Sequence, residues 1–151
     1  MPRWLFLTVL LLSCKSPETT DDLGLGVVLR DVQGDWLLLK WQQFQVGGSG
    51  TADLIALGGT GELTISSTGK FRFQLNVPGY PERVDSGLVV LRGDRLAWEG
   101  ELVETTYLVT LRSGILTLRA TDPLTSTPPV PGGLSGSVLE ELQFRHLTIG
   151  P

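Results

Sequence analysis

The chain has 151 residues, enough for one domain, and its 16 acidic residues outnumber its 12 basic ones, which gives a formal net charge of −4. An acidic chain without a basic stripe is a poor candidate for binding nucleic acid or an anionic lipid surface. Because it has one cysteine, it cannot form an internal disulfide, so we expect the hydrophobic core alone to hold the fold.

The first fourteen residues have the pattern of a secretory signal. Arg3 supplies a positive charge, residues 4–12 are almost wholly apolar, and the small Ser13 precedes the single cysteine, Cys14. This apolar run is too short to span a bilayer, which takes about 20 residues. We therefore predict that residues 1–13 are a signal peptide.

The tetrapeptide Leu11-Leu12-Ser13-Cys14 resembles the lipobox of bacterial lipoproteins, although Leu12 stands where that family more often has a smaller residue. The resemblance implies that Cys14 becomes the acylated first residue, for example palmitoylated, and anchors the protein in a membrane. Lys15 stands where inner-membrane lipoproteins tend to have Asp, which implies the outer membrane, with the periplasmic or surface face left open. The alternative is an ordinary signal peptide that leaves a free cysteine near the mature N-terminus.

The mature chain divides into a tether and a domain. Residues 14–33 are expected to be a flexible tether, polar from Lys15 to Gly24. Residues 34–151 are expected to be one domain of short strands bounded by Gly, Asp, Ser and Pro, a pattern typical of an all-β fold. The predicted strands cover residues 36–46, 52–57, 62–66, 70–77, 87–91, 95–103, 105–112, 115–120 and 137–149.

The strand predicted at residues 70–77 alternates most clearly. Phe71, Phe73 and Leu75 fall on one face, and polar residues such as Arg72 fall on the other. One apolar face and one wet face indicate an antiparallel sheet. Eight or nine strands joined in sequence form an up-and-down meander, which we expect to close into a barrel because closure removes both exposed edges.

Gly34-Asp35-Trp36, at the start of the first strand, resembles the Gly-x-Trp start of lipocalins and lipocalin-like bacterial domains, and similar strand and turn patterns extend the resemblance over residues 34–148. It implies that Trp36 closes one end of the barrel and that an arginine of the last strand packs over it. Arg145 is the matching position, with Arg119 second. The chain has no disulfide and no evident helix before the last strand, which favours a reduced barrel.

The barrel interior is expected to be apolar. The predicted lining residues are Leu38, Leu63, Ile65, Phe71, Phe73, Leu75, Val90, Leu96, Trp98, Tyr107, Val109, Leu116, Leu118, Leu142 and Phe144. The large aromatic members of this set are the candidate ligand-binding residues, namely Phe71, Phe73, Trp98, Tyr107 and Phe144. An eight-stranded barrel is either just filled by its side chains or holds one small ligand.

No catalytic, metal-binding or cofactor-binding residue is predicted. His146 is the only histidine, and a catalytic triad or a metal site needs partners that the sequence does not supply in number. Ser67 and Lys70 have the Ser-x-x-Lys spacing of serine acylases, but they fall on a turn between strands rather than on a helix. Glu99 and Glu101 share one strand face, which we assign to solvent.

The sequence favours a membrane-anchored, non-enzymatic lipoprotein that binds a small apolar ligand or an envelope partner. The binding role rests on analogy with the fold. The alternative is a structural or interaction module of the cell envelope, an inhibitor or assembly factor, with a packed barrel and no ligand. An enzyme that uses the barrel mouth is a third hypothesis.

The variant Cys14→Ser should leave the membrane fraction, because serine offers no thiol for acylation. Immunoblots of the membrane and soluble fractions of cells expressing either chain measure this. A Cys14→Ser chain that still sediments with membranes would show that the anchor hypothesis is wrong.

Overall fold

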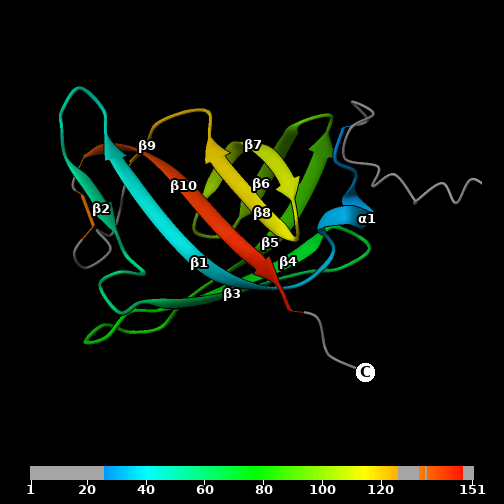
Figure 1. The fold of residues 1–151 in the computed structure, drawn as a ribbon, viewed down its shortest axis with the longest axis horizontal. Helices are drawn as coiled ribbons and strands as arrows, with labels where there is room; N and C mark the ends of the chain where they lie inside the picture. Colours follow the sequence, from blue (N-terminus) through cyan, green and yellow to red (C-terminus); the bar gives the residue numbers. More distant parts are fainter. Residues whose placement is uncertain (1–25, 126–132, 135, 148–151) are drawn as a thin grey trace, which may run out of the picture.

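The computed structural model describes residues 26–125, 133–134 and 136–147, and it is an all-β fold (Figure 1). One short helix, α1 (Leu29–Val32), precedes the strands. The strands are β1 (Gly34–Gln45), β2 (Thr51–Asp53), β3 (Thr60–Ile65), β4 (Lys70–Asn76), β5 (Arg83–Arg92), β6 (Arg95–Gly100), β7 (Glu104–Arg112), β8 (Ile115–Ala120), β9 (Leu124–Thr125) and β10 (Ser137–His146). In these residues no helix has the length and apolar character that crossing a membrane requires.

Eight of the strands form a closed ring (Figure 1). Around the ring β1, β3, β4, β5, β6, β7, β8 and β10 each pair antiparallel with the next, and β10 pairs back with β1. The predicted up-and-down barrel is therefore confirmed. The short strands β2 and β9 lie outside the ring, where they extend β1 and β10.

A β-bulge at Leu39 decides which side chains of β1 face inward. Leu38 and Lys40 pair with consecutive residues of β10, so Leu39 has no partner there. An extra residue of this kind reverses the alternation of the strand, and Trp36 before the bulge and Trp41 after it are both buried. In an unbroken strand Lys40 would face inward and Trp41 would face solvent.

The predicted lining residues are buried, with two differences. Phe73 is only partly buried, because it borders the cavity described below. The prediction for Val90 is wrong, since Val89 is the buried residue of that pair. The hairpin register pairs Val89 with the buried Trp98, and cross-strand partners share a face of the sheet.

The end of the barrel beside α1 is filled by side chains. Trp36 is 1% exposed, and its Nε1 donates a hydrogen bond to the carbonyl oxygen of Val32 at 2.9 Å. The ring of His146 packs edge-on against Trp36, with the centroids 4.8 Å apart. His146 therefore takes the place expected for Arg145, because the register sets Arg145 beside Leu37 on the exposed outer face.

The folded domain begins earlier than the predicted boundary at Gly34. Val32 is fully buried, and Val27 and Leu29 pack against the core. Residues 26–33 therefore belong to the barrel domain rather than to a flexible tether. The preceding residues, Cys14 among them, lie outside the described part of the chain.

Strand β5 is also longer than predicted, because the residues before Gly87 continue the pairing with β4. Asp85, which was predicted to lie in a loop, pairs with Phe73 and is buried. Gly87 pairs with Gly100 of β6. A Cβ atom at Gly87 would overlap the carbonyl oxygen of Glu99, and one at Gly100 would overlap the Asp85 carboxylate. Gly100 thus leaves the space into which Asp85 turns, and Gly87 permits the close approach of β6 to β5.

The variant Gly87→Ala should destabilise the barrel by about 1–3 kcal/mol, because the added methyl group forces β5 and β6 apart. Urea unfolding followed by tryptophan fluorescence measures the free energy of unfolding. Ser86→Ala changes the neighbouring residue on the opposite face and should cost less than about 0.5 kcal/mol. Equal stability of the two variants would contradict the predicted overlap.

Candidate functional site

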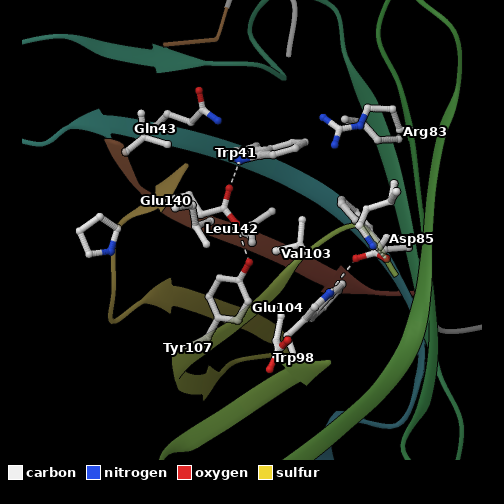
Figure 2. Close-up of a pocket in the computed structure, with 16 residues that line it drawn as sticks. Trp41, Gln43, Arg83, Asp85, Trp98, Val103, Glu104, Tyr107, Glu140 and Leu142 are labelled. Atoms are coloured by element: carbon white, nitrogen blue, oxygen red, sulfur yellow. Dashed lines mark hydrogen bonds between the residues drawn. The ribbon is translucent and has the colours of Figure 1, made fainter. Parts of the chain in front are cut away.

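The end of the barrel opposite α1 holds a cavity of about 270 Å³ (Figure 2). It is partly open to solvent, and its lining includes residues of β9 and of the loop between β6 and β7. The lining residues are Trp41, Gln43, Phe73, Leu75, Arg83, Asp85, Trp98, Leu102, Val103, Glu104, Tyr107, Pro123, Leu124, Val138, Glu140 and Leu142. Most of them are aromatic or aliphatic, and the polar ones are mainly carboxylates.

Glu140 of β10 is a buried carboxylate in the wall of this cavity, only 5% exposed (Figure 2). The Nε1 of Trp41 donates a hydrogen bond to its Oε2 at 2.8 Å, and the hydroxyl of Tyr107 donates one to its Oε1. Burial raises the pKa of Glu140, against the lowering effect of these two hydrogen bonds. Burial, followed by the neighbouring Glu140 charge, raises the pKa of Tyr107 well above its ordinary value.

Asp85 of β5 is a second buried carboxylate, and it is held in a similar way (Figure 2). The Nε1 of Trp98 donates to its Oδ2 at 3.0 Å, and the backbone N–H of Leu102 donates to its Oδ1 at 2.9 Å. The second bond ties the loop between β6 and β7 to the barrel wall. Each carboxylate is thus fixed by one indole and one further donor.

Aromatic rings in mutual contact form much of the cavity wall. Phe73 meets Trp41, Trp98 and Phe144 edge-on, at centroid distances of 6.1, 6.0 and 6.0 Å. Trp98 also meets Tyr107 edge-on at 6.0 Å. Edge-on contacts of this kind are favourable beyond the area they bury, so they help to hold these rings in place.

The rim carries further polar groups. Gln43 is buried, and its Oε1 accepts a hydrogen bond from the backbone N–H of Leu134 at 3.0 Å. Arg83 is half-buried and Glu104 is exposed, and both line the cavity. The described residues contain no group of three or more His, Cys, Asp and Glu side chains that could hold a metal ion. Aromatic faces and carboxylates that are already fixed suit noncovalent binding of a small molecule.

The residues predicted from the sequence are distributed over both ends of the barrel. Phe73, Trp98 and Tyr107 line the cavity, whereas Phe71 and Phe144 lie in the closed core. Trp36 fills the opposite end and Arg145 is exposed, as described above. Glu99 and Glu101 are exposed. Cys14 lies outside the described residues.

Most residues that line the cavity were not predicted, Trp41, Asp85 and Glu140 among them. Trp41 faces inward only because of the bulge, for which the sequence carries no clear signal. Glu140 had a usable signal, since it lies two residues before Leu142 on the same strand face. Asp85 and Glu140 were missed because carboxylates are usually assigned to solvent.

Comparison with known proteins gives no family for this chain, since no protein-family model matches it and no curated protein matches its sequence.

The variant Glu140→Gln should change how stability depends on pH. Because the folded state binds the Glu140 proton more tightly, this residue's contribution is full below its ordinary pKa of 4.5 and declines as pH rises through the raised pKa. The free energy of unfolding of the wild type, relative to the variant, should therefore fall as pH rises above the ordinary value of 4.5.

Urea unfolding at several pH values measures this difference. Glutamine can still accept from Trp41 and can donate to the Tyr107 oxygen, so the variant should fold. Glu99→Gln removes a carboxyl group from the outer surface and is the matched control. If the difference in free energy of unfolding between wild type and Glu140→Gln does not vary with pH, the raised pKa of Glu140 is contradicted.

Proposed function

We propose that this protein is a membrane-anchored, non-enzymatic binding protein that takes a small, largely apolar ligand into the open end of its barrel. The observation that carries the proposal is the cavity of about 270 Å³ with aromatic and aliphatic walls. Ligand sites are typically concave and mostly apolar, with a few placed polar groups, and span about 300–1,000 Å³. This cavity has that composition, and its volume lies just below that range, which favours a small ligand.

The same cavity weighs against an interaction module with a packed barrel. An eight-stranded barrel can be completely filled by its own side chains. Here the closed end is filled, with Trp36 and Phe144 at most 1% exposed, whereas the aromatic rings of the open end surround accessible space. We therefore favour a ligand over a partner protein as the primary target.

The two buried carboxylates also bear on the enzyme hypothesis. All four of their oxygens accept a hydrogen bond from an indole, a phenol or a backbone N–H. Asp85 and Glu140 are therefore held as fixed parts of the wall, each by donors from elsewhere in the barrel. This arrangement supports a binding role more directly than proton transfer to a substrate.

The proposed anchor is Cys14 in the outer membrane, on the resemblance of residues 11–14 to a lipobox and on Lys15. The described chain begins at Gly26, close to Gly93 in the turn between β5 and β6. That turn lies at the closed end of the barrel. An anchor joined there would leave the cavity mouth free for a ligand.

The variant Val103→Trp tests the proposal, because Val103 points into the cavity (Figure 2) and a larger ring there fills it. The full chain is titrated with 1-hexanol by calorimetry, with tryptophan fluorescence as a second readout. Val103→Trp should lower the affinity at least about tenfold, which corresponds to about 1.4 kcal/mol.

Leu108→Trp is the matched control, since Leu108 lies on the exposed outer face of β7. It adds the same bulk outside the cavity and should bind 1-hexanol like the wild type. Native mass spectrometry of the chain purified gently from its host provides an independent check for a bound small molecule. Wild-type protein that binds no apolar probe would favour the interaction module instead.

A further inference from the structure

We propose that the ligand is a small organic cation, an ammonium group on an apolar body, held by the carboxylates and aromatic faces of the cavity. This inference rests on the proposed function and specifies its ligand class.

The cavity has an excess of negative groups. Its titratable lining residues include three carboxylates, from Asp85, Glu104 and Glu140, and one guanidinium, from Arg83. In the described residues no Lys, Arg or His nitrogen lies within 4.0 Å of a carboxylate oxygen of Asp85 or Glu140. Both carboxylates are therefore buried beside neutral donors, without an ion-pair partner.

The neighbouring residue Glu141 shows the contrast. It faces the outside of β10, where Lys40 and Arg119 each approach its carboxylate at 3.6 Å. Among the described residues, Glu141 thus has two cationic partners within 4.0 Å, whereas Glu140 has none within that distance and interacts with Arg83 only from farther away. Because a buried charge is costly without an opposite charge, a ligand cation in the cavity would gain from Glu140 more than it would from an exposed group.

The walls also suit a cation. The faces of tryptophan and tyrosine attract ammonium groups within about 6 Å of the ring centre, most strongly when water is excluded. Trp41, Trp98 and Tyr107 line the cavity together with the carboxylates. Each of these three rings donates a hydrogen bond to Asp85 or Glu140, and donation to an anion makes a ring more electron-rich.

Other ligand classes fit less well. An anion would meet two buried carboxylates, and Arg83 alone could offset them. A neutral apolar molecule would use the aromatic walls and leave the carboxylates without an opposite charge. The cavity volume of about 270 Å³ limits the cation to a small one.

The test compares three probes of equal chain length, n-hexylammonium, 1-hexanol and hexanoate, on the full chain at about pH 7, where the amine and the acid are charged. Calorimetry and tryptophan fluorescence give the affinities. We expect hexylammonium to bind roughly tenfold more tightly than 1-hexanol, and hexanoate to bind more weakly than either.

The variant Glu140→Gln should reduce the preference of hexylammonium over 1-hexanol severalfold. Glu99→Gln removes an exposed carboxylate outside the cavity and should keep the preference. If Glu140→Gln fails to fold, the three-probe series on the wild type still decides the matter, and Asp85→Asn provides a second variant.

The outcomes separate the two proposals. Equal binding of hexylammonium and 1-hexanol, or tighter binding of hexanoate, overturns the cation inference and leaves the ligand-binding function standing. The cation inference is also overturned if Glu140→Gln and Asp85→Asn both keep the wild-type preference for hexylammonium over 1-hexanol. Failure of all three probes to bind overturns the proposed function itself.

Discussion

The pairing of β1 with β10 makes the barrel a closed ring, and the candidate site depends on it. The register sets Gln43 opposite Glu140, so the indole of Trp41, two residues earlier on the same face, reaches the carboxylate. That register requires the bulge at Leu39, because an unbroken β1 would turn Trp41 outward and Lys40 inward. The extra residue at Leu39 therefore allows β1 to contribute Trp36 to the filled end and Trp41 to the open end.

Three of the four tryptophans have a common role in this structure. Each buries its ring and donates its Nε1 to a buried acceptor, namely the Val32 carbonyl oxygen for Trp36, Glu140 for Trp41 and Asp85 for Trp98. A buried indole needs such an acceptor. At the closed end this acceptor is a backbone carbonyl oxygen, and side chains fill the barrel there. At the open end the acceptors are carboxylates, and the cavity lies beside them.

The sequence predicts the fold well because most strands alternate and most turns carry clear signals. It predicts only part of the site. The aromatic residues Trp98 and Tyr107 were expected from alternation within single strands, but Trp41 depends on a bulge that only pairing with β10 reveals. Asp85 and Glu140 are buried against the usual preference of carboxylates for water, and the donors that permit this come from other strands.

Glu140 interrupts a buried apolar face of β10. Its neighbours on the same face of β10, Val138, Leu142 and Phe144, are buried apolar residues, and leucine at 140 would continue their pattern. A buried carboxylate without an ion pair is costly. Burial raises the pKa of Glu140, and the hydrogen bonds from Trp41 and Tyr107 act in the opposite direction. A leucine at 140 would leave the Trp41 Nε1 and the Tyr107 hydroxyl without this acceptor, and a buried donor without an acceptor is itself costly. The carboxylate therefore joins β1, β7 and β10 at the open end of the barrel.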